Sequence, residues 1–513
     1  MTAVILAMIL LPLAMALLLL TPLRPVIPRT LGLAPVPGLL LLPAAWRAGS
    51  ASVTLPGGWT LLLDQPGALM LGASTLLWII GGLAASRWLA GRAGRESFAL
   101  WWLLTLSGSL GVFVAGDVAS FYALYALASL PAYGLIAFGG GGADRHAARI
   151  TLAAALIGEA FILAAFVMMA AAGAGQGLAI LLLVIGFGLK IGLVPLHGWM
   201  PMSYAAGPLV ATAVLSGATS KAGIIGLVRF LPLDAAMPMA GGLLAAAGLF
   251  AAFYGAVLGL TQSNPRSVLA YSSISQLGQM AAVLGLGLAA GVAGAAAVVA
   301  CYAAYHVLAK GGLFLMLGAR EEGRVLPKWQ FLLAGLTALG FAGLPLTGGA
   351  LGKLALKDVT GSGAAGLLFA LAAIGSTMLV LHFLRLLRTA RGESLPAAAW
   401  IAAGLAASLL QWSLFAAVTG VSPLSALKPG ALLDLSWPIA VGALLSWLTA
   451  AAGIRLPAVA PGDIGARAIG AVAAIASRAV AFAASAESMM RRWPVSSLAM
   501  AGVLVVLVLL LHG

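Results

Sequence analysis

The chain has 513 residues, of which 62% are hydrophobic and only 8% are charged. Soluble domains usually carry about 25% charged residues, so this composition excludes a water-soluble fold. Mean hydropathy is +1.11. Apolar runs of about 20 residues, enough to cross a ~30 Å hydrocarbon core, recur from Met1 to Leu511. The sequence therefore predicts an all-α integral membrane protein.

The net charge of +14 does not indicate nucleic acid, because no basic stripe with interleaved aromatic residues is present. A single cysteine, Cys301, excludes a disulfide framework and cysteine-ligated clusters. The five histidines are scattered without metal-ligand spacing. We therefore expect no cofactor, no metal and no nucleic-acid partner.

The apolar runs and their breakers predict about sixteen transmembrane spans. The first, near the N-terminus, lacks a basic region before it and favours a membrane helix over a cleaved signal peptide. The second is crowded by prolines at its start. In chain order the predicted centres are Leu11, Leu40, Leu76, Leu106, Leu127, Leu163, Leu183, Ser220, Leu249, Leu277, Tyr305, Leu339, Leu371, Leu409, Leu444 and Val503.

Basic residues alternate between the predicted loops. Odd-numbered loops hold most of them, including Arg92 and Arg388, whereas even-numbered loops show only Arg47, Lys357 and Lys428 besides Arg229 near a helix end. By the positive-inside rule the odd loops are cytoplasmic. We expect a multi-pass protein of the bacterial inner (cytoplasmic) membrane with its N-terminus outward.

Two predicted spans are interrupted by proline and glycine at membrane depth. Residues 186–202 contain Pro195 and His197, and residues 340–357 contain Pro345 and Gly348. Proline removes a backbone donor and glycine loosens the helix, so both spans should be broken. Comparable broken helices in two halves indicate an inverted repeat around an ion path, although coincidence in a chain with 66 glycines is the alternative.

The predicted organisation follows from these breaks. Two inverted five-helix repeats occupy residues 101–232 (spans four to eight) and 237–391 (spans nine to thirteen). Residues 1–100 hold three spans, residues 396–455 hold two, and residues 494–512 form the last. The charged segment 463–492 is expected to be an amphipathic helix on the cytoplasmic face, with a plain connector as the alternative.

Four lysines lie well inside predicted spans: Lys190, Lys221, Lys310 and Lys353. A charge at a helix centre costs about 2.5–3.5 kcal/mol on insertion scales, so these positions need an explanation. Snorkelling to the interface is one, but Lys190 and Lys221 sit too deep for it. Desolvation favours neutral lysine, which brings it toward proton exchange. Such groups, linked by water, form a candidate ion path.

Two further residues join this candidate path. His306 is four residues before Lys310, on the same helical face, and is a relay candidate unless it makes only a structural hydrogen bond. Glu159 is the one acid deep inside a span, and we expect Lys190 on the next helix to be its partner. A protonated glutamate bonded to a backbone carbonyl is the alternative.

At these residues the chain resembles the antiporter-like subunits of respiratory complex I, membrane-bound hydrogenases and Mrp-type multisubunit cation/proton antiporters. The matching stretches are GLKIGLVPLHGWMP (188–201), SGATSKAGIIGLVRF (216–230), NPRSVLAYSSISQLG (264–278), YHVLAKGGLFLMLG (305–318) and GLPLTGGALGK (343–353). The resemblance implies that Lys190 is the pumping lysine, Lys221 the central one and Lys353 the terminal one. It also places His306 and Lys310 on the family's histidine–lysine helix, and it likens the 463–492 segment to a short form of the family's lateral helix.

The chain departs from the family pattern at three positions. Ala126 stands where the family has a glutamate, Met202 replaces an aspartate after the first break, and Gln276 replaces a histidine. The absence of a glutamate at Ala126 puts conventional proton coupling in doubt.

The favoured function is a proton- or cation/proton-translocating subunit of a multisubunit membrane complex, such as an NADH-quinone oxidoreductase, a membrane-bound hydrogenase or an Mrp antiporter. Its expected partners are other membrane subunits, the lipid bilayer, and protons or sodium as transported ions. No redox motif is present, so any driving chemistry belongs to partner subunits. The alternatives are the membrane subunit of an inorganic-carbon uptake complex, a non-pumping scaffold, and a stand-alone solute transporter. A shortage of intramembrane polar residues disfavours the last.

Overall fold

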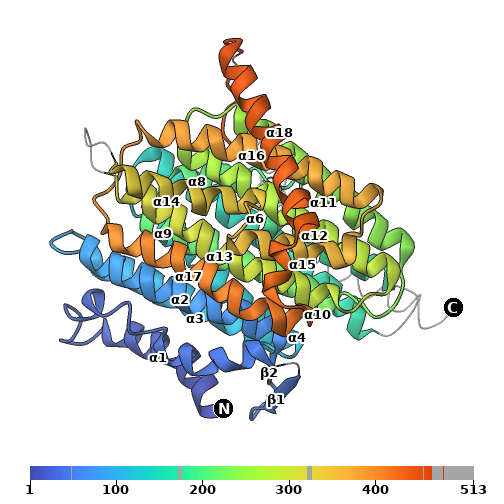
Figure 1. The fold of residues 1–513 in the computed structure, drawn as a ribbon. Helices are drawn as coiled ribbons and strands as arrows, with labels where there is room; N and C mark the ends of the chain where they lie inside the picture. Colours follow the sequence, from blue (N-terminus) through green and yellow to red (C-terminus); the bar gives the residue numbers. More distant parts are fainter. Residues whose placement is uncertain (48, 172–175, 321–325, 455, 465–477, 479–513) are drawn as a thin grey trace, which may run out of the picture.

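The structure is a computed structural model that describes residues 1–47, 49–171, 176–320, 326–454, 456–464 and 478. Almost all of the ordered elements are helices packed side by side (Figure 1). Several helices begin at polar caps where the chain leaves a loop. Asp64, Asp117 and Asn264 each accept hydrogen bonds from backbone N–H groups of the first turn that follows.

The N-terminal part differs from the prediction at its second span. Instead of a long α-helix, the residues around Leu40 form an 11-residue 3-10 helix, with proline at its start and inside it. A short antiparallel hairpin follows, which the apolar pattern did not predict. The elements of this part are α1 (Thr2–Leu18), η1 (Ile27–Arg29), η2 (Val36–Trp46), β1 (Ser50–Thr54), β2 (Thr60–Asp64) and α2 (Gln65–Trp88).

The first predicted five-helix unit contains more elements than five, because several of its helices are interrupted. They are α3 (Arg95–Gly111), η3 (Val112–Val114), α4 (Val118–Ser129), α5 (Ala132–Ala137), α6 (Gly142–Ala170), α7 (Gln176–Ile191), α8 (Trp199–Ala205), α9 (Leu209–Gly217), η4 (Thr219–Lys221) and α10 (Ala222–Phe230).

The second predicted unit and the helices after it complete the described chain. They are α11 (Pro238–Leu260), α12 (Pro265–Ala290), α13 (Ala295–Gly318), α14 (Lys328–Leu339), η5 (Gly340–Ala342), α15 (Gly348–Thr360), α16 (Ala364–Leu387), α17 (Ala397–Thr419), η6 (Pro423–Leu427) and α18 (Pro429–Ala451). Of these, α18 crosses the face of the bundle and extends past the other helices (Figure 1).

Eleven helices of the described residues are long and apolar enough to cross a membrane, and three apolar helices are shorter. Helical elements cover every predicted centre from Leu11 to Leu444. The remaining centre, Val503, and nearly all of the predicted amphipathic helix at 463–492 lie outside the described residues. The chain is therefore a multi-pass membrane protein, while the count of sixteen stays a prediction.

Two of the spans that carry lysines lie in the interior of the bundle. The α9–α10 span and α13 are buried along most of their length, whereas α18 is mostly exposed at the periphery. Helix α13 packs against α2, α9, α12, α15 and α17. Since these neighbours shield α13 from lipid, its polar side chains face protein rather than hydrocarbon.

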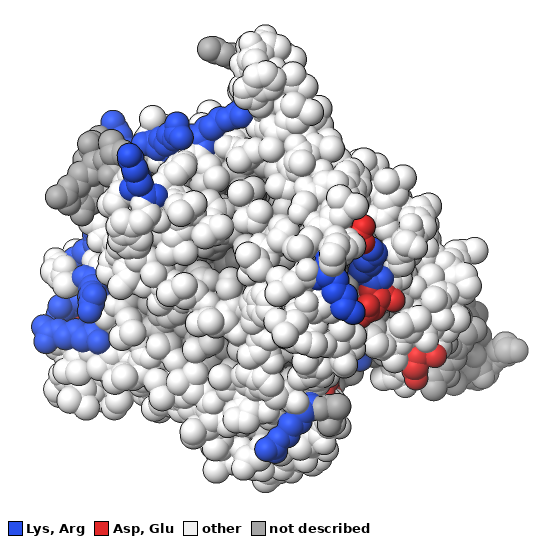
Figure 2. All heavy atoms as spheres, in the orientation of Figure 1, with Lys and Arg blue, Asp and Glu red and all other residues white. Residues whose placement is uncertain are grey.

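Two arginines tie loops to the ends of the bundle. Arg266 donates to the Gly207 carbonyl (2.8 Å) and to Glu393 (2.7 Å). Arg229 donates to Phe113 O (2.7 Å) and to Asp64 Oδ1 (3.0 Å). On the face shown in Figure 2, many basic side chains lie along the left and upper edges, and the acidic ones lie at the right beside further basic ones.

Candidate functional site

Lys190 lies on the last turn of α7, immediately before the first break (residues 192–198). It is 9% exposed, and its Nζ donates to Ser129 Oγ on α4 at 2.7 Å. Its ammonium also lies 5.4 Å from the centre of the Tyr125 ring. A hydroxyl and an aromatic face therefore solvate this lysine, and sequence reasoning had singled out neither residue.

Glu159 is buried on α6, next to a close contact of that helix with α7. A Cβ on Gly158 would lie 3.2 Å from the Gly186 carbonyl oxygen, so only a small residue allows the two backbones to meet there. Glu159 Oε1 has no hydrogen-bond partner among the described residues. Glu159 lies on the helix that packs against the Lys190 helix, but it forms no ion pair with that lysine within the described chain.

A small cavity lies between Lys190 and the Lys221 region. Its volume is about 30 Å³, which is room for about two water molecules. Lys190 and Ser129 line one side, and Thr219 and Ser220 line another. Water in this cavity would connect the first lysine to the residues that precede the second.

Lys221 is fully buried at the end of η4, where its span changes from α9 to α10. Its Nζ donates to the Ser216 carbonyl at 2.9 Å and to Ser220 Oγ at 3.1 Å. The sequence predicted two broken spans, and this third interruption was missed because it contains no proline. The 3-10 turn matters because the Ser216 carbonyl becomes an acceptor for the ammonium.

Lys310 and His306 are both fully buried on α13. Lys310 Nζ donates to Ser272 Oγ and to Leu269 O (3.3 Å) on α12, and it lies 4.5 Å from the centre of the Phe341 ring. Neither ring nitrogen of His306 has a hydrogen-bond partner in the described chain. Both ring nitrogens of His306 are therefore available to exchange a proton, one helical turn before Lys310.

A polar network crosses α12, α13 and α16 beyond Lys310. Tyr302 Oη donates to Gln276 Oε1, and Gln276 Nε2 donates to Ser376 Oγ at 3.0 Å. Gln276 thereby links α12 to α13 and to α16. Polar side chains recurring along α12 were the signal that could have predicted this network.

Lys353 on α15 is partly buried, with its Nζ 3.5 Å from Gln279 Oε1 on α12. It lines a second cavity of about 280 Å³, together with Lys357 and Asp434. Lys357 and Asp434 form an ion pair that is about half exposed. This cavity therefore leads from Lys353 to the molecular surface.

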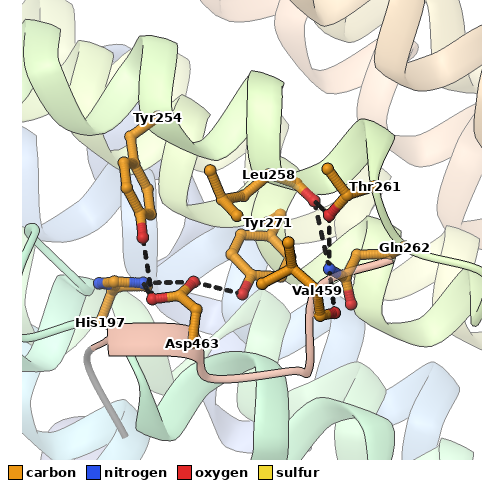
Figure 3. Close-up of polar contacts among 8 residues, drawn as sticks. All are labelled: His197, Tyr254, Leu258, Thr261, Gln262, Tyr271, Val459 and Asp463. Carbon is orange, nitrogen blue, oxygen red and sulfur yellow. Dashed lines mark hydrogen bonds and ion pairs between the residues drawn. The ribbon is translucent and has the colours of Figure 1, made fainter. Parts of the chain in front are cut away.

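The predicted breaks are present as interruptions of the helices. The first break follows α7 and contains Pro195 and His197. The second (residues 343–347) contains Pro345 and precedes α15, which begins at Gly348. His197 is fully buried, and its Nε2 lies 3.1 Å from both carboxylate oxygens of Asp463 (Figure 3). Sequence reasoning had no means of placing these two residues together, because 266 positions separate them.

A helical membrane protein with lysines buried in and beside broken helices is the class that the fold and site define. The family model for the NADH:quinone oxidoreductase/Mrp antiporter transmembrane domain matches residues 115–379. The chain is 31% identical over 402 residues to NADH-quinone oxidoreductase subunit N of Desulforudis audaxviator, covering 68% of this chain and 76% of that one. The chain belongs to the NADH:quinone oxidoreductase/Mrp antiporter transmembrane family.

Two further comparisons agree with this membership. A Na(+)/H(+) antiporter subunit from Alkalihalophilus pseudofirmus is 26% identical over 59% of this chain and 67% of its own length. The structure of the Mrp complex from Dietzia sp. DQ12-45-1b has a TM-score of 0.72 at 21% identity. That match covers 99% of this chain but 62% of the Mrp chain, and it shows a shared fold. These relatives are antiporter-like subunits of multisubunit membrane complexes.

Proposed function

We propose that this chain is a proton- or cation/proton-translocating subunit of a multisubunit membrane complex. The observation that supports this most is the surroundings of the four lysines. Hydroxyl, carbonyl and amide oxygens accept from their ammonium groups, and none of them forms an ion pair with a carboxylate in the described part of the chain. A carboxylate would hold the proton on a lysine, whereas neutral partners let it leave.

The proposed path runs along Lys190, Lys221, Lys310 and Lys353. The small cavity extends from Lys190 to the residues that precede Lys221, and His306, four residues before Lys310 on α13, relays between Lys221 and Lys310. Gln279 on α12 accepts from Lys353, and the larger cavity connects Lys353 to the surface. Glu159 modulates the first lysine through its charge.

Irregular backbone lies along this path at the two breaks. The first contains Pro195 and His197, and the second contains Pro345 and ends where α15 begins, at Gly348. We propose that the two units at 101–232 and 237–391 are inverted repeats. In support, α7–α8 and α14–α15 each occupy the fourth span of their unit. Irregular backbone is tolerated at membrane depth where it lines a buried polar route.

A non-pumping scaffold is the second candidate function. Ala126 lacks the family's acid, and Glu159 makes no ion pair with Lys190 in the described chain. The buried lysines oppose this interpretation, because a scaffold gains nothing from the cost of inserting them.

Flux through the native complex tests the proposed function. Sealed inverted membrane vesicles from cells with and without this chain are compared for proton uptake and for sodium uptake. We expect the deletion to abolish one of these fluxes and re-expression to restore it. Equal fluxes in vesicles with and without the chain would contradict a translocating role.

The orientation is also a proposal, with the N-terminus outward in a bacterial inner membrane. A cysteine replacing Asp234 should react with an impermeant thiol reagent in intact cells, whereas cysteines replacing Arg92 or Arg388 should not. The native Cys301 is fully buried, so the parent chain gives the background. Labelling at position 92 in sealed cells would show that the proposed orientation is wrong.

A further inference from the structure

The chain after α18 returns to the body of the protein and inserts one acidic side chain into it. The Asp463 side chain is 5% exposed and lies among residues of three other elements. His197 Nε2 lies 3.1 Å from both oxygens, Tyr254 Oη on α11 donates to Oδ1 (2.8 Å), and Tyr271 Oη on α12 donates to Oδ2 (2.6 Å) (Figure 3). Asp463 therefore ties the first break to the first two helices of the second unit.

A buried carboxylate is costly unless it is paired and hydrogen-bonded. Burial alone raises the pKa of Asp463, but hydrogen bonds from His197, Tyr271 and Tyr254 outweigh burial and hold that pKa well below its usual range. Stability from these contacts is present above the ordinary aspartate pKa and is lost only as pH falls through the lowered one. The carboxylate thus stays charged at any physiological pH.

A second anchor holds the same stretch of chain. Gln262 Nε2, in the loop after α11, donates to the Val459 carbonyl at 3.0 Å (Figure 3). We name residues 456–464 the C-terminal latch. With one backbone anchor and one carboxylate anchor, its position is fixed relative to α11 and α12.

Contacts continue from His197 to the first lysine. Trp199, two residues after His197, donates its indole N–H to the Leu189 carbonyl at 2.8 Å. Trp199, Leu189 and Lys190 all line the small cavity. His197 Nδ1 is buried without a hydrogen-bond partner among the described residues, so the carboxylate is what orients this ring. A shift of Asp463 would therefore move His197 and, two residues on, Trp199, which lines the cavity.

We propose that Asp463 is a positioning residue of the ion path, acting through His197, and that the C-terminal latch sets the conformation of the first break. This inference rests on the proposed function. It differs from a plain structural attachment because the charge at Asp463, and not only docking of the segment, is required for flux.

The test uses the assembled complex in sealed vesicles. Asp463→Asn keeps the size of the side chain and removes its charge, and Asp463→Glu restores the charge. Asp234→Asn is the matched control, since Asp234 is exposed in a loop and lies outside the proposed path. A reporter Leu196→Cys, at a partly exposed position in the first break, is labelled with a membrane-permeant maleimide in each background.

We expect Asp463→Asn to lower flux by about tenfold, within the usual range of coupling between distinct sites. It should also speed labelling at position 196 several-fold. Asp463→Glu should recover part of the flux, and Asp234→Asn should match the parent in both measurements. Recovery by glutamate is the result that a purely structural role of the segment would not produce.

Two results would overturn the latch: unchanged flux in assembled Asp463→Asn, or lowered flux with unchanged labelling at position 196. The Lys221→Ala variant keeps this separate from the proposed function. If Lys221→Ala abolishes flux and Asp463→Asn does not, only the latch is wrong. If neither variant alters flux, the proposed function itself is wrong.

Discussion

Replacing Lys221 with alanine is expected to abolish ion flux while the complex still assembles. Lys221 is fully buried, and its ammonium is held by the Ser216 carbonyl and the Ser220 hydroxyl. Losing the amine leaves the Ser216 carbonyl with the Ser220 hydroxyl as a donor, and it removes the cost of a buried cation. The net effect on folding should therefore be small, whereas the path loses its central proton carrier.

Lys221→Arg should fail as completely, because guanidinium does not release its proton in proteins. This separates proton exchange from a mere need for positive charge. The measurement is flux in sealed vesicles, normalised to the amount of co-purified complex. Lys428→Ala, at an exposed loop position, is the control and should conduct like the parent. Normal flux through assembled Lys221→Ala complex would end the lysine-path proposal.

Glu159→Gln is expected to stop transport with the fold preserved. Glutamine matches glutamate in size, so packing at the α6–α7 contact beside Gly158 stays intact. What disappears is the charge that acts on Lys190. A nearby carboxylate stabilises the charged form of a lysine, and weakening that influence is the switch a pump requires. Glu96→Gln, which changes a partly exposed acid, is the control.

Adding Ala126→Glu to the Glu159→Gln chain should restore part of the flux. Ala126 is three residues before Ser129 on α4, hence on the same helical face as the hydroxyl that accepts from Lys190. A carboxylate there would act on the same ammonium, as the family's glutamate is expected to do. If the Glu159→Gln chain conducts like the parent, Glu159 does not take the role of the glutamate that is absent at Ala126. If Glu159→Gln stops flux and Ala126→Glu does not restore it, the result shows only that transport requires Glu159.

The sequence predicted the features that depend on composition and short-range order. Apolar length located the helices from Leu11 to Leu444, because the hydrocarbon core requires a fixed run of apolar residues. Proline and glycine located the interruptions at Pro195 and Pro345, because both residues weaken the helix wherever they occur. The burial of Lys190, Lys221 and Lys310 was also predictable, because each lies inside a long apolar run.

Tertiary structure alone decided which groups touch these lysines. Ser129 and Ser272 come from helices distant in sequence, and their direction depends on how each helix is rotated and crossed. The 3-10 turn that ends at Lys221 likewise contains no proline that would have predicted it. The contact of His197 with Asp463 is the largest such case, because the carboxylate comes after α18 and its partners lie in the first break, on α11 and on α12.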